Sequence, residues 1–161
     1  MKPVVASVVI DRPPEDVFAY LDTLGKRPEF TDHYLVDWSF SGPQRGVGAK
    51  ARTRVHTSAS NRDWVDVEVV ETKTPERIVE HATGARGKRL TVTTYALQPA
   101  AGGCTRVELA TWDEKAPRTE RVMHPVQRPW LRRVSTRALR RLKENLEGGQ
   151  TPFRVVEGSG A

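Results

Sequence analysis

The residues best suited to proton transfer in this 161-residue sequence are its four histidines, and they are widely scattered. A histidine side chain titrates close to neutral pH, so it can serve there as a general acid or base. His56 ends a segment of alternating charged residues, where we expect it to be solvated. His33 and His124 fall in segments that we expect to be loops, and no spacing identifies a partner for either. We therefore retain His33 and His124 as candidate catalytic residues without assigning a reaction.

Glu80 poses a separate question, because the segment around it can face either way. If Ile78 points to the interior, Glu80 does so too, and its carboxyl group lies in or near a cavity. A buried carboxyl group needs a hydrogen-bonding partner or must hold its proton. The opposite facing buries Val79 and exposes Glu80. The pattern leaves both facings open for the whole of segments 76–83 and 88–98. We retain Glu80 as the third candidate catalytic residue.

The sequence contains none of the common catalytic motifs. It has no G-x-S-x-G nucleophile turn, no phosphate-binding glycine loop, no dinucleotide-binding fingerprint and no H-E-x-x-H metal motif. Cys104 is the only cysteine, which excludes an internal disulfide and a cysteine-based metal cluster. We expect neither a metal nor a cofactor.

The aromatic side chains are better candidates for binding a ligand. Pockets for small molecules are lined mainly by apolar and aromatic groups, with a few polar groups that fix the orientation of the ligand. Packing in the core is an equally good interpretation of any one of them. The predicted ligand-binding residues are Phe30, Tyr34, Trp38, Phe40, Thr53, Tyr95 and Trp130.

The elements that position these residues begin with a β-branched strand at residues 3–11. Two prolines then open a helix that Gly25 ends, and residues 26–34 form a second short helical turn or a loop. Beyond Leu35, six predicted strands are separated by turns rich in glycine and proline. In the first of them, Val36, Trp38 and Phe40 share one face. In the second, the small residues Ala49, Ala51 and Thr53 lie opposite Lys50, Arg52 and Arg54.

The last element is a long amphipathic helix, Pro129–Glu147, which is the clearest single element of the sequence. Pro129 fits the first turn, where the missing N–H costs nothing, and two glycines after Glu147 end the helix. At helical spacing, one apolar stripe is formed by Leu131, Val134, Ala138, Leu142 and Leu146. This stripe needs a partner surface, which the strands can supply.

The positive charge of the chain is concentrated in this region. The chain has 26 Lys/Arg and 20 Asp/Glu, a net charge of +6, and residues 118–147 hold nine Lys/Arg against three Glu. Such a surface can bind nucleic acid, an anionic membrane or an acidic protein. A solvated helix face whose arginine stems cover apolar residues is the preferred interpretation.

Length and composition predict one domain at residues 1–148 and a disordered tail at 149–161. No apolar run approaches the roughly 20 residues needed to span a bilayer, and the N-terminus lacks the features of a signal peptide. We therefore expect a cytoplasmic protein. The order of elements predicts an α+β fold, in which an antiparallel sheet curls around the last helix.

The opening segment, SVVIDRPPEDVFAYLDTLGKRPEF, resembles the start of the START-like, or SRPBCC, superfamily and its polyketide cyclase/dehydrase branch. The matching positions are Glu15, Val17, Phe18, Leu21 and Asp22, with Gly46 and Gly48 at the turn into the third strand. The resemblance spans roughly residues 4–147 and implies a helix-grip fold. In that fold, a seven-stranded antiparallel sheet curves around a long C-terminal helix, with two short helices after the first strand and a deep cavity between sheet and helix.

The resemblance implies that a hydrophobic or amphipathic small molecule, lipid- or polyketide-like, binds in that cavity. The first alternative is an enzyme of the polyketide cyclase, aromatase or dehydratase type that uses the same cavity, and we rank a binding protein ahead of it. Binding of an anionic partner, nucleic acid or a membrane surface, by the arginine-rich helix ranks third. Fold alone does not decide between these functions. The sequence identifies neither the ligand nor the oligomeric state.

Overall fold

Alternating apolar and polar residues produce seven strands, which form one antiparallel sheet in the order β1-β7-β6-β5-β4-β3-β2. The computed structural model describes residues 2–56, 63–121 and 124–148. The strands are β1 (Val4–Ile10), β2 (Leu35–Ser41), β3 (Lys50–Val55), β4 (Asp63–Lys73), β5 (Arg77–Gly84), β6 (Arg89–Ala100) and β7 (Cys104–Lys115). The α-helices are α1 (Pro14–Asp22), α2 (Pro28–Thr31), α3 (Arg118–Arg121) and α4 (His124–Gly148), and the short 3-10 turns are η1 (Leu24–Lys26), η2 (Ala85–Gly87) and η3 (Ala101–Gly103).

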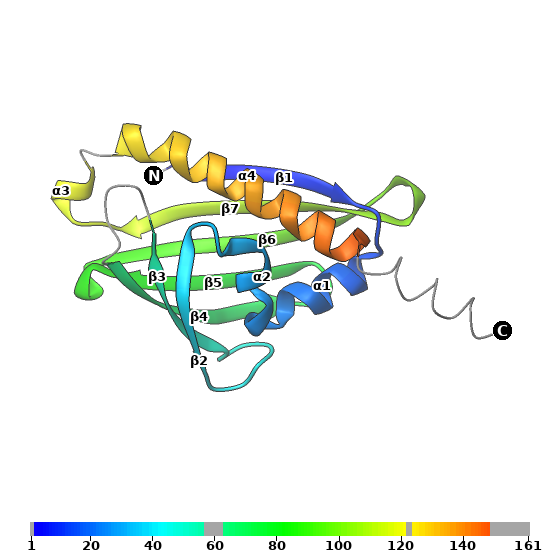
Figure 1. Ribbon diagram of the computed structural model, residues 1–161, viewed down its shortest axis with the longest axis horizontal. Helices are drawn as coiled ribbons and strands as arrows, with labels where there is room; N and C mark the ends of the chain where they lie inside the picture. Colours follow the sequence, from blue (N-terminus) through cyan, green and yellow to red (C-terminus); the bar gives the residue numbers. More distant parts are fainter. Residues whose placement is uncertain (1, 57–62, 122–123, 149–161) are drawn as a thin grey trace.

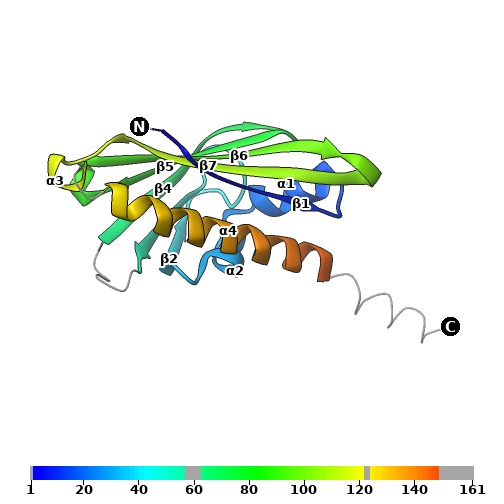
Figure 2. The same cartoon turned by 90° about the horizontal axis from the view of Figure 1, so that it is seen from above.

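Helices α1, α2 and α4 all lie on one face of the curved sheet (Figures 1 and 2). We call this the inner face and the opposite one the outer face. Helix α4 packs mainly on β1 and α2. The predicted α+β fold, a seven-stranded sheet curved around a long C-terminal helix with two short helices after the first strand, is confirmed.

Four members of the predicted apolar stripe of α4 are buried, with Val134, Ala138, Leu142 and Leu146 all at most 9% exposed, while Leu131 is half-buried. The predicted start at Pro129 was wrong, because the helix begins at His124 and contains Pro129. A proline at this point removes one hydrogen bond in the second helical turn, and its ring lies on the solvent side. Packing of the stripe therefore outweighs that local cost.

Strand β3 shows the predicted division between the faces. Ala51 and Thr53 are buried on the inner face, while Lys50 and Arg52 are exposed on the outer face. The outer charges pair across strands, as in the contact of 3.3 Å between Arg52 Nε and Asp66 Oδ1. Ala51 and Thr53 are at most 4% exposed, so the core fills the space beneath this part of the sheet.

A bulge in β2 changes the predicted facing of that strand. The register of β2 against β3 shifts between Val36 and Ser39, and Asp37 adopts a positive φ of 57°. Val36 is consequently opposite Arg54, while Phe40 is opposite Ala51 on the other face. The expectation that Val36 shares a face with Trp38 and Phe40 was therefore wrong. One inserted residue reverses the facing of all that follow it.

The facing of β5 and β6, which the sequence left open, is settled by the structure. Ile78 and Glu80 both lie inside, at 0% and 7% exposed, opposite Tyr95 and Thr93 of β6. Val79 is also buried, at 6% exposed, next to a register shift in β4. Among the described residues, no helix is long and apolar enough to cross a membrane. The tail at 149–161, predicted to be disordered, lies outside those residues.

Candidate functional site

The most distinctive feature of the inner face is a buried ion pair between Arg27 and Glu80. Arg27 lies between η1 and α2, and Glu80 lies on the central strand β5. Arg27 Nε donates to Glu80 Oε1 at 2.9 Å, and its Nη2 donates to the same oxygen. Its third donor, Nη1, reaches the Leu21 carbonyl at the end of α1 at 2.5 Å. The ion pair therefore joins the two short helices to the sheet.

Aromatic rings surround this pair. The Arg27 guanidinium lies 4.9 Å from the centre of the Tyr95 ring and 5.8 Å from that of Phe30. Burial lowers the pKa of Arg27, but the adjacent Glu80 carboxylate outweighs this effect and the net shift is upward, so the guanidinium stays charged. Arg27 was not among the candidates, although a buried Glu80 required a partner of this kind.

Two tyrosine hydroxyl groups belong to the same cluster. Tyr95 is 4% exposed and Tyr34 is half-buried. Burial raises the pKa of both hydroxyl groups above the usual value of 10.0, and the charge of Arg27 only partly offsets it. Neither hydroxyl has a hydrogen-bond partner in the described part of the protein. We call Arg27, Glu80, Tyr34 and Tyr95 the inner polar cluster.

One side of this cluster leads towards the surface. The rings of Tyr34 and Trp130 meet edge to face, with centres 6.2 Å apart. Trp130 is half-buried, as are Ala82 and Thr93 on the inner sides of β5 and β6. Half-buried side chains at these positions mean that the inner face is not completely filled by the core.

The predicted ligand-binding residues divide between two places. Phe30, Tyr34, Tyr95 and Trp130 lie in or beside the inner polar cluster. The other three belong to β2 and β3, and the Phe40 ring, 45% exposed, stacks on Trp38 with 5.6 Å between centres. Thr53 Oγ1 donates to the Val36 carbonyl at 2.8 Å, so its hydroxyl links β3 to β2.

His33 is held by contacts to α4. One ring nitrogen lies 2.9 Å from the Val134 carbonyl, and the other lies 3.2 Å from Arg141 Nη1. Burial, together with two nearby arginines, lowers the pKa of His33 below its ordinary 6.5. Both nitrogens are thus engaged in fixing α2 against α4. The side chain of His124 lies outside the described residues.

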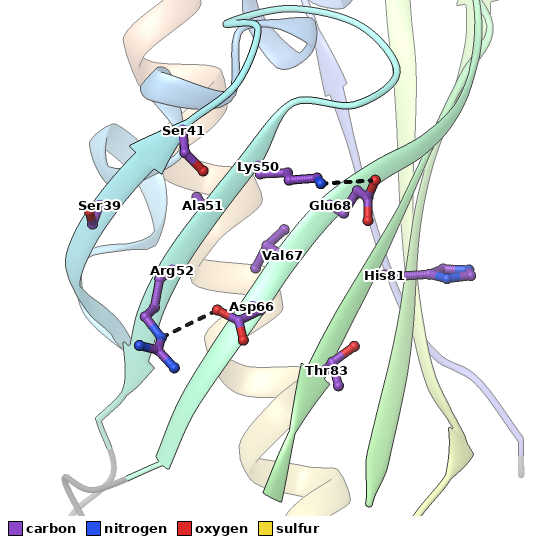
Figure 3. Close-up of a pocket in the computed structure, with 10 residues that line it drawn as sticks. All are labelled: Ser39, Ser41, Lys50, Ala51, Arg52, Asp66, Val67, Glu68, His81 and Thr83. Atoms are coloured by element: carbon purple, nitrogen blue, oxygen red, sulfur yellow. Dashed lines mark ion pairs between the residues drawn. The ribbon is translucent and has the colours of Figure 1, made fainter. Parts of the chain in front are cut away.

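A concavity lies on the outer face, away from α4 (Figure 3). It encloses about 400 Å³ and is lined by polar side chains of β2 to β5, including His81 and Thr83. Its charged residues are paired with each other, Lys50 with Glu68 and Arg52 with Asp66, and these side chains are about half-exposed or more. This polar groove lacks the aromatic lining that marks a small-molecule pocket.

The basic residues of α4 form a third candidate surface. Arg133, Arg137 and Arg140 follow each other at helical spacing on its exposed side, and we call them the arginine stripe. Within the described residues, no carboxylate forms an ion pair with this stripe. Arg141, by contrast, pairs with Asp32 beside α2. The described residues also contain no group of three or more side chains that could hold a metal ion.

Comparisons with known proteins agree with the fold. A Thermus thermophilus protein, TTHA0849, has a similar structure, with a TM-score of 0.75 and 16% identity over 92% of this chain and 99% of that one. The KanY protein (ms6282) aligns with a TM-score of 0.71 and 22% identity over 90% of this chain and 97% of that one. DynU16, a protein of the dynemicin biosynthetic locus, aligns with a TM-score of 0.62 and 17% identity over 92% of this chain but only 48% of that one. Identities this low show the fold alone.

A search of curated proteins finds no match to this sequence. The family model described as "Polyketide cyclase / dehydrase and lipid transport" matches residues 1–147, almost the whole chain. The resemblance seen in the opening residues is thereby confirmed, and the protein belongs to the polyketide cyclase/dehydrase and lipid transport family of the START-like superfamily.

Proposed function

We propose that this protein binds a hydrophobic or amphipathic small molecule between the inner face of the sheet and α4. The hydroxyl groups of Tyr34 and Tyr95 carry this proposal. Among the described residues, the fully enclosed side-chain nitrogen or oxygen without a partner is Arg54 Nε, so the two hydroxyl oxygens are not fully enclosed and can meet a bound molecule. Neither hydroxyl has a partner within the described ranges, and a ligand with a polar atom supplies one.

The surroundings of the two hydroxyl groups suit such a ligand. Trp130 provides aromatic surface beside Tyr34, and Phe30 packs next to Arg27. Ala82 and Thr93 provide a floor of small side chains on the sheet. Apolar and aromatic walls with a few converging polar atoms are the usual composition of a small-molecule site. The family description, which includes lipid transport, is consistent with this type of ligand.

Binding is preferred to catalysis because two of the three candidate acid–base residues are held by protein partners. Glu80 is paired with Arg27, and both ring nitrogens of His33 are engaged by α4. The tyrosine hydroxyls remain protonated donors, a property that suits orientation of a ligand oxygen.

Two neighbouring residues on β5 allow a direct test. Ala82→Phe places a ring on the inner face, while Thr83→Phe places the same ring on the outer face, where Thr83 lines the polar groove (Figure 3). The assay is the fluorescence of Nile red, an uncharged dye that brightens when it leaves water. Saturable binding by the native protein and by Thr83→Phe, lost in Ala82→Phe, is expected. Equal binding by both variants contradicts the proposal.

Native mass spectrometry provides an independent measurement. Protein purified under mild conditions should retain a small molecule in part of the population, and the adduct should be absent from a correctly folded Ala82→Phe variant. Circular dichroism of both variants verifies that they fold. No dye binding and no adduct in the native protein would refute a ligand site on the inner face.

A further inference from the structure

The charges of the inner polar cluster cancel each other. Arg27 and Glu80 are 2% and 7% exposed and lie in direct contact. Arg27 gives two donors to Glu80 and one to the Leu21 carbonyl, so each of its three nitrogens has a protein partner. A ligand that reaches this pair therefore meets a polar surface without net charge.

Glu80 nevertheless retains one oxygen for a further hydrogen bond. Both bonds from Arg27 end on Oε1, and no residue within the described ranges donates to Oε2. A carboxylate oxygen is a strong acceptor and cannot donate. Thr93 lies directly opposite Glu80 on β6 and is only half-buried, so this part of the inner face is accessible.

The two tyrosines offer the complementary chemistry. Their hydroxyl groups stay protonated at neutral pH, so each can donate a hydrogen bond. Both hydroxyl groups are close enough to Glu80 for its negative charge to raise their pKa. The cluster thus combines one unused acceptor with two unused donors. An alcohol or phenol hydroxyl satisfies both requirements, because its oxygen accepts while its O–H donates.

We infer that the ligand is uncharged and carries a hydroxyl group, which donates to Glu80 Oε2 and accepts from Tyr34 or Tyr95. This inference rests on the proposed function and adds the chemical class of the ligand. A carboxylate ligand is repelled by the Glu80 carboxylate. The positive charge of Arg27 does not offset this repulsion, because Glu80 already neutralises it. Asp113, bonded to Thr91 further along the inner face, adds a second acidic group. An ammonium ligand can donate to Glu80 Oε2 but cannot accept a hydrogen bond, so it leaves the donors of Tyr34 and Tyr95 unused.

The test uses four compounds with one naphthalene body: 2-naphthylmethanol, 2-methylnaphthalene, 2-naphthoate and 2-naphthylmethylamine. Each competes with Nile red on the native protein at neutral pH. The alcohol should bind about fivefold more tightly than the methyl compound, in line with one or two net hydrogen bonds. It should bind at least about tenfold more tightly than either ion, because each ion loses its hydration and satisfies only the donor half or the acceptor half of the cluster.

A charge variant tests the role of Glu80 itself. Glu80→Gln leaves the Arg27 charge uncompensated, so affinity for 2-naphthoate should rise about tenfold. Glu68→Gln on the outer face, where Glu68 meets exposed Lys50, is the matched control and should change no affinity. If Glu80→Gln does not fold, the relative affinities of the four naphthalene compounds for the native protein decide whether the inference holds. An ion that competes as well as the alcohol, or an alcohol no better than the methyl compound, overturns the inference. Absence of both Nile red binding and a retained adduct refutes the proposed function instead.

Discussion

Removal of one partner of the Arg27–Glu80 pair should destabilise the protein far more than removal of both. Arg27→Met leaves the Glu80 carboxylate, 7% exposed, without any donor, and the expected cost is about 3–5 kcal/mol of unfolding free energy. Glu80→Met leaves the Arg27 guanidinium, 2% exposed, without its counter-ion at a comparable cost of about 3–5 kcal/mol. Either loss is a large part of the stability of an ordinary domain, which is about 5–15 kcal/mol.

The double variant should recover most of this loss, because two apolar side chains of similar size leave no buried charge. Replacing a buried pair in this way is often neutral or stabilising. Here the Leu21 carbonyl still loses its donor, Arg27 Nη1, so we expect a net cost of about 1–3 kcal/mol. The predicted coupling between the two substitutions is therefore at least about 3 kcal/mol.

Urea unfolding followed by circular dichroism measures these free energies, provided that the dependence on urea is unchanged among the variants. The exposed pair Arg52–Asp66 is the control. Its atoms are 3.3 Å apart, but its side chains are 59% and 67% exposed, so a coupling of only about 0–1 kcal/mol is expected. Additive effects at Arg27 and Glu80, or coupling no larger than in the control, would refute the reasoning.

Three further measurements test other parts of the structure. Burial raises the pKa of all three tyrosines, and it raises that of Tyr20 to about 12. The near-ultraviolet absorbance of the folded protein should therefore show no tyrosinate step near pH 10.0. Such a step would contradict the described burial. The folded-state pKa of His33 lies below 6.5, so the unfolded chain binds the proton first as pH falls, and stability should decline below about pH 6.5. This decline should be smaller in His33→Asn, and an identical pH profile would exclude His33 as a cause. If the arginine stripe binds anionic vesicles, binding should weaken steeply with salt and be lost when all three arginines are changed to Gln. Binding that does not depend on salt would show that the arginine stripe is not the binding surface.

The regular part of the fold was predictable because its signal is local. Alternation along β3 fixed which side chains point inward, and the stripe of α4 fixed which face of the helix is buried. Where a single residue breaks the regular pattern, the prediction fails. The bulge at Asp37 reverses the facing of β2, and α4 continues through Pro129 because its packing compensates for a lost hydrogen bond.

The ion pair at the site was not predictable in full, because its partners are 53 positions apart in the sequence. The segment around Glu80 allowed an inward carboxylate, but nothing local indicated which basic residue meets it. Arg27 lies in a short turn between two helices, where an arginine is ordinarily solvated. Only the packing of α1 against β5 and β6 brings it to Glu80.

The location of Arg27 also makes the proposed binding site dependent on the ion pair. The Arg27 carbonyl accepts a hydrogen bond of 2.6 Å from Thr31 Oγ1, and the Thr31 carbonyl accepts one of 3.0 Å from the Tyr34 N–H. A short chain of contacts therefore runs from Arg27 through α2 to Tyr34, whereas Tyr95 is fixed independently by β6.

Because Tyr34 depends on Arg27 and Tyr95 does not, substitutions can distinguish the contribution of the ion pair to stability from its contribution to positioning Tyr34. Tyr34→Phe and Tyr95→Phe should each weaken binding of 2-naphthylmethanol while leaving the free energy of unfolding within about 1 kcal/mol of the native value, since neither hydroxyl bonds to the described protein. Arg27→Met should reduce both stability and binding. In an Arg27→Met background, Tyr34→Phe should have little further effect on affinity because Tyr34 is already displaced, whereas Tyr95→Phe should keep its full effect. Equal effects of the two substitutions in that background would show that α2 holds Tyr34 without help from Arg27.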